Sequence, residues 1–140
     1  PLIDFIPVAR QELVVIVPPD HPLSDRTEIR LCETLDYPQI LFSRRSGLRP
    51  MIDKLFLACG KQPDCIFEID EDQTIAGFVA NGFGIAVVPN MPILASMHLK
   101  VIHITEANWE RRFYIAYLKN RYRTPLAEQF LSYVKSHALI

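Results

Sequence analysis

The sequence contains no long apolar run and no concentration of charge of one sign. A helix that crosses a membrane needs about 20 consecutive apolar residues, and every apolar run here is far shorter. Lys and Arg number 15 against 16 Asp and Glu, which gives a net charge of −1. Because backbone contacts to nucleic acid need concentrated Lys and Arg, the composition argues against autonomous DNA binding. We therefore expect neither a membrane nor, for this chain by itself, DNA as a partner.

The sequence also lacks the short motifs of common enzymes. It has no G-x-G-x-x-G, no phosphate-binding P-loop and no G-x-S-x-G nucleophile turn. His21 follows an apolar run, but no nucleophile motif accompanies it, so a structural histidine in a turn is the better interpretation. The sequence thus predicts no catalytic residues and no cofactor.

A metal site is not expected either. Cys59 and Cys65 have five residues between them, which is outside the usual spacing of zinc ligands. His98 and His103 are five apart, which places them on opposite faces of a straight strand.

Cysteines are few, and their number is odd. A secreted disulfide scaffold more often shows a dense, even set, whereas Cys32, Cys59 and Cys65 stand in mostly apolar surroundings. The first residues, 1–5, do not form a secretory signal, since they lack a basic region and a long apolar core. We therefore expect buried free thiols in a reducing, cytoplasmic compartment.

What the sequence does contain is a regular alternation of strand and helix patterns in 140 residues, enough for one domain with a core. Apolar runs predict strands, the one at 99–104 at a sheet edge, and spaced apolar stripes predict helices. The expected strands are 13–17, 37–42, 65–69, 85–88, 99–104 and 113–118. The expected helices are 48–59, 74–81 and one that begins at Pro125 with Thr124 as its N-cap, with weaker helical turns at 29–35 and 91–97. This order predicts a largely parallel α/β sheet.

The sequence also predicts local features at a pair of glycines, at an acidic run and on the last helix. Gly82 suits the residue after a helix, and Gly84 allows close backbone packing before the strand at 85–88. The acidic run 70–72 is expected to cap the helix at 74–81. The last helix carries an apolar stripe that is expected to be buried against other parts of a domain, with these members: Leu126, Phe130, Tyr133, Val134 and His137.

In this order and spacing, three segments resemble the effector-binding domain of LysR-type transcriptional regulators. They are Glu12-Leu-Val-Val-Ile-Val-Pro-Pro-Asp-His-Pro-Leu23, the helix around 52–56 with Gly60 and Pro63, and Gly77-Phe-Val-Ala-Asn-Gly-Phe-Gly-Ile-Ala-Val-Val-Pro89. The ending, Arg112-Phe-Tyr-Ile-Ala-Tyr117 followed by Thr124-Pro125, is similar as well. The resemblance covers roughly residues 10 to 138.

The resemblance implies a Rossmann-like α/β fold of the periplasmic-binding-protein type II, in which two subdomains are joined by two crossover strands. It implies a second subdomain at 20–103, with 1–19 and 104–140 as crossover strands and a remnant of the first. Most of the first subdomain is expected to be missing, which leaves apolar surface of the last helix exposed. It further implies a small effector in the cleft, a homo-oligomer (dimer or tetramer), and DNA contact only through a domain absent from this chain.

The principal candidate site is the turn that follows the strand at 37–42. It comprises Ser43, Arg44, Arg45, Ser46 and Gly47. A helix begins there, so free N–H groups, the helix dipole and the side chains of Arg44, Arg45 and Arg49 favour a carboxylate or phosphate. In the resembled family this turn faces the cleft. The alternative is that Ser46 merely caps the helix and that the arginines, Arg49 included, are solvated.

A second candidate group is Phe83 and Gly84, although a purely conformational role for the glycines is favoured. Redox sensing is disfavoured, because peroxide-sensing relatives carry a reactive cysteine near the turn at 43–47, where this chain has serines. The function that these patterns favour is effector sensing for a transcription factor. The alternatives are a solute-binding protein of a transport system and, less favoured, an α/β enzyme.

Overall fold

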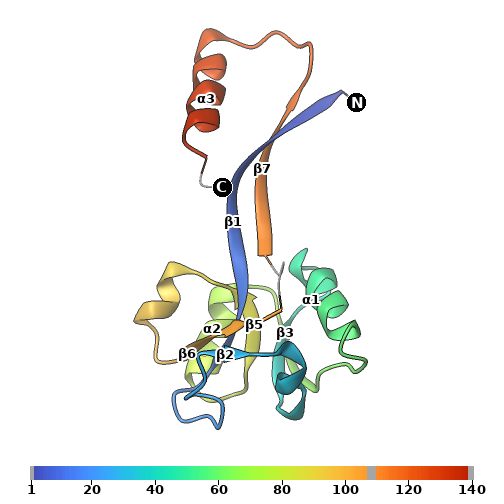
Figure 1. Cartoon of the computed structure of the whole chain (residues 1–140), viewed down its shortest axis with the longest axis vertical. Helices are drawn as coiled ribbons and strands as arrows, with labels where there is room; N and C mark the ends of the chain where they lie inside the picture. The colour runs from blue at the N-terminus through green and yellow to red at the C-terminus, as the bar shows by residue number, and fades with distance from the viewer. Residues whose placement is uncertain (1, 107–109, 139–140) are drawn as a thin grey trace. The chain divides into compact units, whose positions relative to one another are not determined.

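The computed structural model describes residues 2–106 and 110–138, which form two compact units. One unit comprises residues 12–109, and the other comprises the residues up to 11 together with those from 110 onward. Figure 1 shows the elements along the chain. In the part that the structure describes, no helix has the length and apolar character needed to cross a membrane.

The larger unit is built on a mixed sheet in the order β2–β6–β1–β5. The strands are β1 (Ile3–Val17), β2 (Glu28–Ile29), β5 (Ala86–Pro89) and β6 (Lys100–Ile104). Residues 13–17 of β1 lie between β5 and β6 and pair antiparallel with both, with Val14 opposite Val88 and His103. Every residue from 13 to 17 is buried, as a β-branched run covered on both faces predicts.

Two further parallel strands extend the unit beyond β5. They are β3 (Gln39–Phe42) and β4 (Cys65–Ile69), which pair with each other, and Gln39 forms a parallel bridge with Ile85 just before β5. The expected largely parallel sheet is thus interrupted by β1, which runs antiparallel to its neighbours. The prediction that 99–104 is an edge strand is wrong, because β6 lies between β1 and β2.

Helices α1 (Leu48–Leu57) and α2 (Asp72–Ala80) pack on these strands, and their apolar stripes form the core with the sheet. Ile52 and Phe56 of α1 are fully buried, as the spacing of apolar residues predicts. The weaker turns are 3-10 helices, η1 (Leu31–Asp36) and η2 (Pro92–Ser96). The helical positions were therefore predicted well for this unit.

Gly84 is the glycine whose missing side chain matters most for the core. Its φ is +158°, and an added Cβ would lie 3.1 Å from both the Pro38 carbonyl oxygen and the Ile66 side chain. We expect Gly84→Ala to lower the free energy of unfolding by about 1–3 kcal/mol, measured by urea denaturation. The matched control is Gly77→Ala within α2, where nothing lies within 4 Å and alanine should stabilise by about 0.5–1 kcal/mol. Equal midpoints for the two variants would contradict the argument.

The smaller unit contains the start of β1, β7 (Glu110–Leu118), which pairs with it, and α3 (Pro125–Ser136). Thr124 caps α3 as predicted, since its hydroxyl accepts a 3.2 Å hydrogen bond from the N–H of Ala127. The stripe is not buried within this chain, because Leu126, Phe130 and Tyr133 are exposed, which confirms the expectation that the last helix leaves apolar surface exposed. A helix of this unit has few other elements on which to bury an apolar face.

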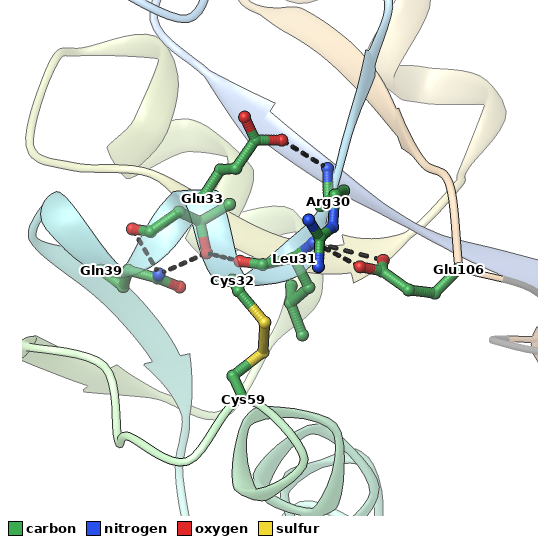
Figure 2. Close-up of a disulfide and its surroundings, with 8 residues drawn as sticks. Arg30, Leu31, Cys32, Glu33, Gln39, Cys59 and Glu106 are labelled. Carbon is green, nitrogen blue, oxygen red and sulfur yellow. Dashed lines mark hydrogen bonds between the residues drawn. A yellow bond between two sulfur atoms is a disulfide. The ribbon is translucent and has the colours of Figure 1, made fainter.

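The expectation of three buried free thiols is also wrong. Cys32 of η1 and Cys59, two residues beyond α1, form a disulfide with their Cα atoms 5.5 Å apart (Figure 2). Cys65, at the start of β4, is the free cysteine and is exposed. Spacing along the chain could not reveal the pair, because only the packing of α1 on η1 brings the two cysteines together.

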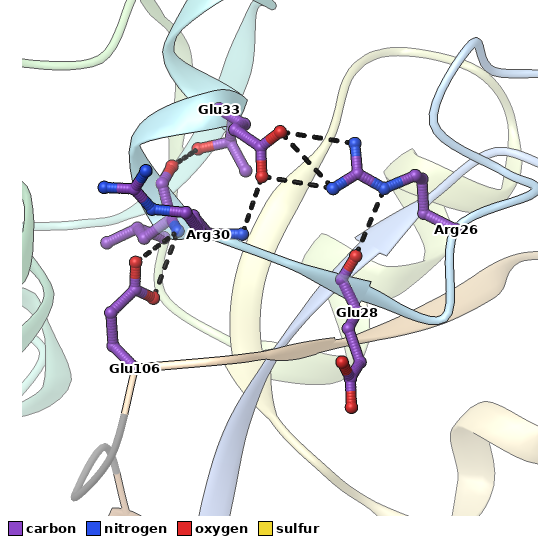
Figure 3. Close-up of polar contacts among 7 residues, drawn as sticks. Arg26, Glu28, Arg30, Glu33 and Glu106 are labelled. Carbon is purple, nitrogen blue, oxygen red and sulfur yellow. Dashed lines mark hydrogen bonds and ion pairs between the residues drawn. The ribbon is translucent and has the colours of Figure 1, made fainter.

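The residues around η1 are tied together by polar contacts (Figure 3). The N–H of Leu31 donates to both carboxylate oxygens of Glu106, at 3.2 Å each. The carboxylate of Glu33 accepts a 2.9 Å bond from the N–H of Arg30 and pairs with Arg26 at 3.1 Å. The bonds from Arg30 and Arg26 lower the pKa of Glu33. These contacts hold the start of η1, and hence Cys32, in place.

Candidate functional site

The carboxyl ends of the parallel strands of the larger unit carry polar residues. Ser43 follows β3, Asp70 follows β4 and Asn90 follows β5, and these strands run in one direction. Their carboxyl ends therefore meet at one edge of the sheet, which is where open α/β sheets bind ligands. We call this edge the carboxyl edge.

The turn 43–47 forms the centre of the carboxyl edge. It is folded by bonds from the Ser46 N–H to the Ser43 carbonyl, at 3.0 Å, and from the Leu48 N–H to the Ser46 hydroxyl, at 3.2 Å. Ser46 thus does help to cap α1. Within the described residues, the backbone N–H groups of Arg44, Arg45 and Gly47 make no hydrogen bond, and all three residues are exposed or half-buried. These donors stand at a helix N-terminus, where they suit an anion.

Asp70 adds negative charge to a turn for which the sequence predicts only positive charge. The Ser43 hydroxyl donates a hydrogen bond to its carboxylate, and Arg45 forms a 2.8 Å ion pair with it. The run 70–72 supplies the N-cap of α2, Glu71, and an acidic residue in its first turn, Asp72, as predicted, although the Glu71 side chain makes no capping bond. The turn therefore presents a carboxylate beside its cationic groups and is not simply electropositive.

Arg49 does not belong to the surface of the turn. The residue is 7% exposed, and its side chain donates to the Phe42 carbonyl at 2.7 Å, to Asp53 at 2.9 Å and to Glu68 at 3.1 Å. Burial alone would lower the pKa of Arg49, but the bonds to Asp53 and Glu68 outweigh it and raise the pKa. Neither the prediction that Arg49 offers its guanidinium to an effector nor the alternative that it is solvated is right, because the side chain fastens the end of β3 to α1 and β4.

A second polar cluster at the same edge was not recognised from the sequence. Glu12 accepts a 3.0 Å hydrogen bond from the Asn90 side chain and lies 3.2 Å from a ring nitrogen of His103. The partners are 78 and 91 residues apart, so no local spacing could pair them. The sequence could have indicated this cluster only through the places of its residues, because Asn90 directly follows a strand and Glu12 directly precedes the buried run of β1.

Phe83 and Gly84 lie away from this edge. Gly84 approaches Pro38 and Ile40 at the start of β3, whereas Ser43 follows its end, about 10 Å further along at 3.3 Å per residue. Phe83 is 52% exposed, with its ring centre 5.3 Å from that of Phe78 and 6.1 Å from that of Phe67. The structure therefore keeps the predicted residues 43–47 together and places the other two at the opposite end of β3.

Two hollows lie on the surface of the larger unit. One, of about 330 Å³, is lined by Pro18, Pro19, Asp20, Ala80, Asn81, Gly82 and His98. The other, of about 430 Å³, adjoins η2 and is lined by Asn90, Met91, Pro92, Leu94, Ala95 and Val101. Of these two, the second reaches a residue of the carboxyl edge, and its lining is mostly apolar. No group of three or more His, Cys, Asp or Glu side chains within the described ranges could hold a metal ion.

The sequence profile of the family described as LysR substrate binding domain matches residues 1–139. The chain belongs to this family. The HTH-type transcriptional regulator YybE of Bacillus subtilis is 38% identical over 135 residues, which cover 96% of this chain and 46% of that protein. The chain spans about half the length of the curated relatives that it matches, among them CysL of the same organism, at 23% identity.

Solved structures agree with this assignment. The effector-binding domain of QuiR in complex with shikimate is 39% identical, with a TM-score of 0.86 over 97% of this chain and 65% of that one. The regulatory domain of CcmR from Synechocystis PCC6803, in complex with 2-PG, is 25% identical with a TM-score of 0.84, over 98% of this chain and 67% of that one. The Rossmann-like periplasmic-binding-protein type II fold is thereby confirmed. These matches are domains of transcriptional regulators and not enzymes, and they do not favour the transport alternative.

Proposed function

We propose that this chain is the sensing part of a LysR-type regulator and binds a small hydroxylated carboxylic acid at the carboxyl edge. The observation that supports this most is the turn 43–47, where unpaired N–H donors and arginines stand beside the carboxylate of Asp70. The similar QuiR domain is in complex with shikimate, and the CcmR domain with 2-PG. Both ligands are anionic acids, and shikimate also carries free hydroxyl groups, so shikimate is the first probe.

In this proposal, the acid group of the effector binds the N–H groups of Arg44, Arg45 and Gly47 at the start of α1. Arg44 makes no hydrogen bond or ion pair with other described residues, so its guanidinium is available to a carboxylate. Arg45 can turn from Asp70 to the ligand at small cost, because exposed ion pairs contribute only about 0–1 kcal/mol. Asp70 then accepts a hydrogen bond from a hydroxyl of the effector, which favours a hydroxylated acid over a plain one.

The test is calorimetric titration of the full-length regulator with shikimate. We expect the double variant Ser43→Ala/Arg44→Ala to bind at least about 10-fold more weakly than wild type, since it loses one hydroxyl and one charge-assisted contact. Arg121→Ala, which removes one exposed arginine outside this unit, is the matched control and should bind like wild type. An equal Kd for the double variant and wild type would exclude the turn from the site. Benzoate has no hydroxyl group, so equal affinity for benzoate and shikimate would contradict the proposed hydrogen bond from the effector to Asp70.

The remaining family properties are part of the same proposal. The predicted subdomain 20–103 makes up most of the larger unit, which also includes the buried residues 13–17 of β1, and the effector binds at the carboxyl edge of this unit. DNA contact comes from a helix-turn-helix outside residues 1–140, the regulator is a dimer or tetramer, and it acts in the cytoplasm. A ligand changes DNA binding only if it binds two conformations of the regulator with different affinities.

A further inference from the structure

The two cysteines of the Cys32–Cys59 disulfide flank the candidate site in the sequence. Cys32 lies in η1, which leads through β3 into the turn 43–47, and Cys59 lies just beyond α1, which begins after that turn. The disulfide, with a sequence separation of 27, thus closes a covalent ring that contains the whole turn and both elements that hold it. No other part of the described chain is enclosed by a covalent link.

The larger unit does not need this link to form a core. Its sheet and helices share one continuous set of buried apolar side chains, from Leu13 in β1 to Ile102 in β6. Small secreted domains depend on disulfides because their cores are small, whereas disulfides of intracellular proteins are mostly transient or redox-sensing. A disulfide in a transcriptional regulator with its own core therefore points to a reversible bond.

We propose that Cys32 and Cys59 form a reversible thiol–disulfide pair whose state sets the affinity of the turn 43–47 for its effector. This inference rests on the proposed function, because it concerns the same turn. It differs from the redox hypothesis that the sequence disfavoured, in which the reactive cysteine would lie at the turn itself.

The co-reactant is a low-molecular-weight disulfide, RSSR. The thiolate of one cysteine attacks a sulfur of RSSR, which gives a mixed disulfide and releases one thiolate. The second cysteine then attacks the protein sulfur of the mixed disulfide, which closes the Cys32–Cys59 bond and releases the second thiolate. The protein loses two electrons and two protons, and RSSR becomes two RSH. Both cysteines are half-buried, so a small reagent has access to them.

The expected consequence follows from preorganisation. In the oxidised form, η1 and the far end of α1 are joined, so the turn between them has fewer conformations to lose when an anion binds. In the reduced form, η1 and α1 are held together only by packing. We therefore expect the oxidised regulator to bind shikimate about 5-fold more tightly, at the lower end of usual coupling.

Cys65 offers a matched control for these experiments. It is exposed and lies outside the ring, and its thiol donates to the Phe67 carbonyl at 3.5 Å. Partial removal from solvent and the nearby Glu68 carboxylate raise its pKa, which makes it a poor thiolate. Cys65→Ser should therefore keep the redox response, and Cys32→Ser should lose it.

The test equilibrates the full-length regulator in buffers of increasing glutathione disulfide to glutathione ratio, and measures two quantities. Alkylation and mass spectrometry give the fraction of the Cys32–Cys59 bond, and hydrogen exchange gives the protection of residues 44–57. We expect the bond to open and close within the range of these buffers, with faster exchange of 44–57 in the reduced form. Calorimetry with shikimate on both forms then gives the affinity ratio.

Three outcomes would overturn the inference. The bond could stay closed in millimolar dithiol under native conditions, exchange of 44–57 could be the same in both forms, or both forms could bind shikimate equally. If neither form binds shikimate, the proposed function fails in its choice of ligand. In that case, equal exchange of 44–57 in the two forms still refutes the switch, and different exchange supports it. Cys32→Ser behaving like wild type in the glutathione buffers would refute it independently of any ligand.

Discussion

Replacing Arg49 with methionine is expected to lower the free energy of unfolding by about 3 kcal/mol. Methionine keeps most of the apolar stem but removes the donors that reach the Phe42 carbonyl, Asp53 and Glu68. The Phe42 carbonyl would lose a buried partner, which costs about 1–3 kcal/mol, and a hydrogen bond to a charged group contributes about 1.5–3 kcal/mol. Because Asp53 and Glu68 are partly exposed, water can solvate them, so we place the loss near the lower end of the combined range.

Urea denaturation followed by circular dichroism measures this change. Arg45→Met is the matched control, since it makes the same substitution four residues earlier at an exposed ion pair and should cost no more than about 1 kcal/mol. Arg49→Lys should recover little of the loss, because an ammonium group is not a planar fork that can reach three acceptors in different directions. A loss at Arg49 no greater than at Arg45 would show that the buried guanidinium contributes nothing to the fold.

The sequence predicted the elements of the larger unit because their signals are local. The segment 13–17 is a run that only a fully covered strand explains, and the stripe with Ile52 and Phe56 has a helical period. Thr124 before a proline specified the start of α3 for the same reason, as the structure shows. Each of these inferences needed only residues that are close to one another in the sequence.

The candidate site was predicted less completely, because its chemistry depends on strands that are distant in sequence. Asp70 lies 27 residues from Ser43, and it occupies the carboxyl edge only because β4 pairs parallel with β3. Arg49 was expected to offer a cationic side chain to the effector. It lies three residues before Ile52 and seven before Phe56, on the buried side of α1, but the sequence could not show that Glu68 of β4 would be its partner. The disulfide was missed because only the packing of α1 on η1 brings the two cysteines together. An odd number of cysteines does not exclude one pair.

Reduction of the Cys32–Cys59 disulfide is expected to have the largest effect on stability. A cross-link with a sequence separation of 27 stabilises by restricting the unfolded chain, by about 3.5 kcal/mol in the chain-entropy account. For a chain of this size, that corresponds to a fall of about 10 °C in Tm, measured by thermal unfolding with and without dithiol. Cys65→Ser should unfold like wild type in both conditions, and the double variant Cys32→Ser/Cys59→Ser should unfold like reduced wild type. The same Tm in both buffers would show that the bond does not restrict the unfolded chain.

Each of the two changes also removes one attachment of α1 in the folded state, so combining them tells whether the helix is held as one piece. Arg49 fastens the first turn of α1 to β3 and β4, and Cys59 fastens its far end to η1. If the two attachments are independent, the losses from Arg49→Met and from reduction should add within about 0.5 kcal/mol. If α1 detaches as a unit once either end is released, the second change should cost less than it does alone. The second result would mean that the redox state of Cys59, beyond the far end of α1, affects the turn 43–47 through the 10 residues of the helix.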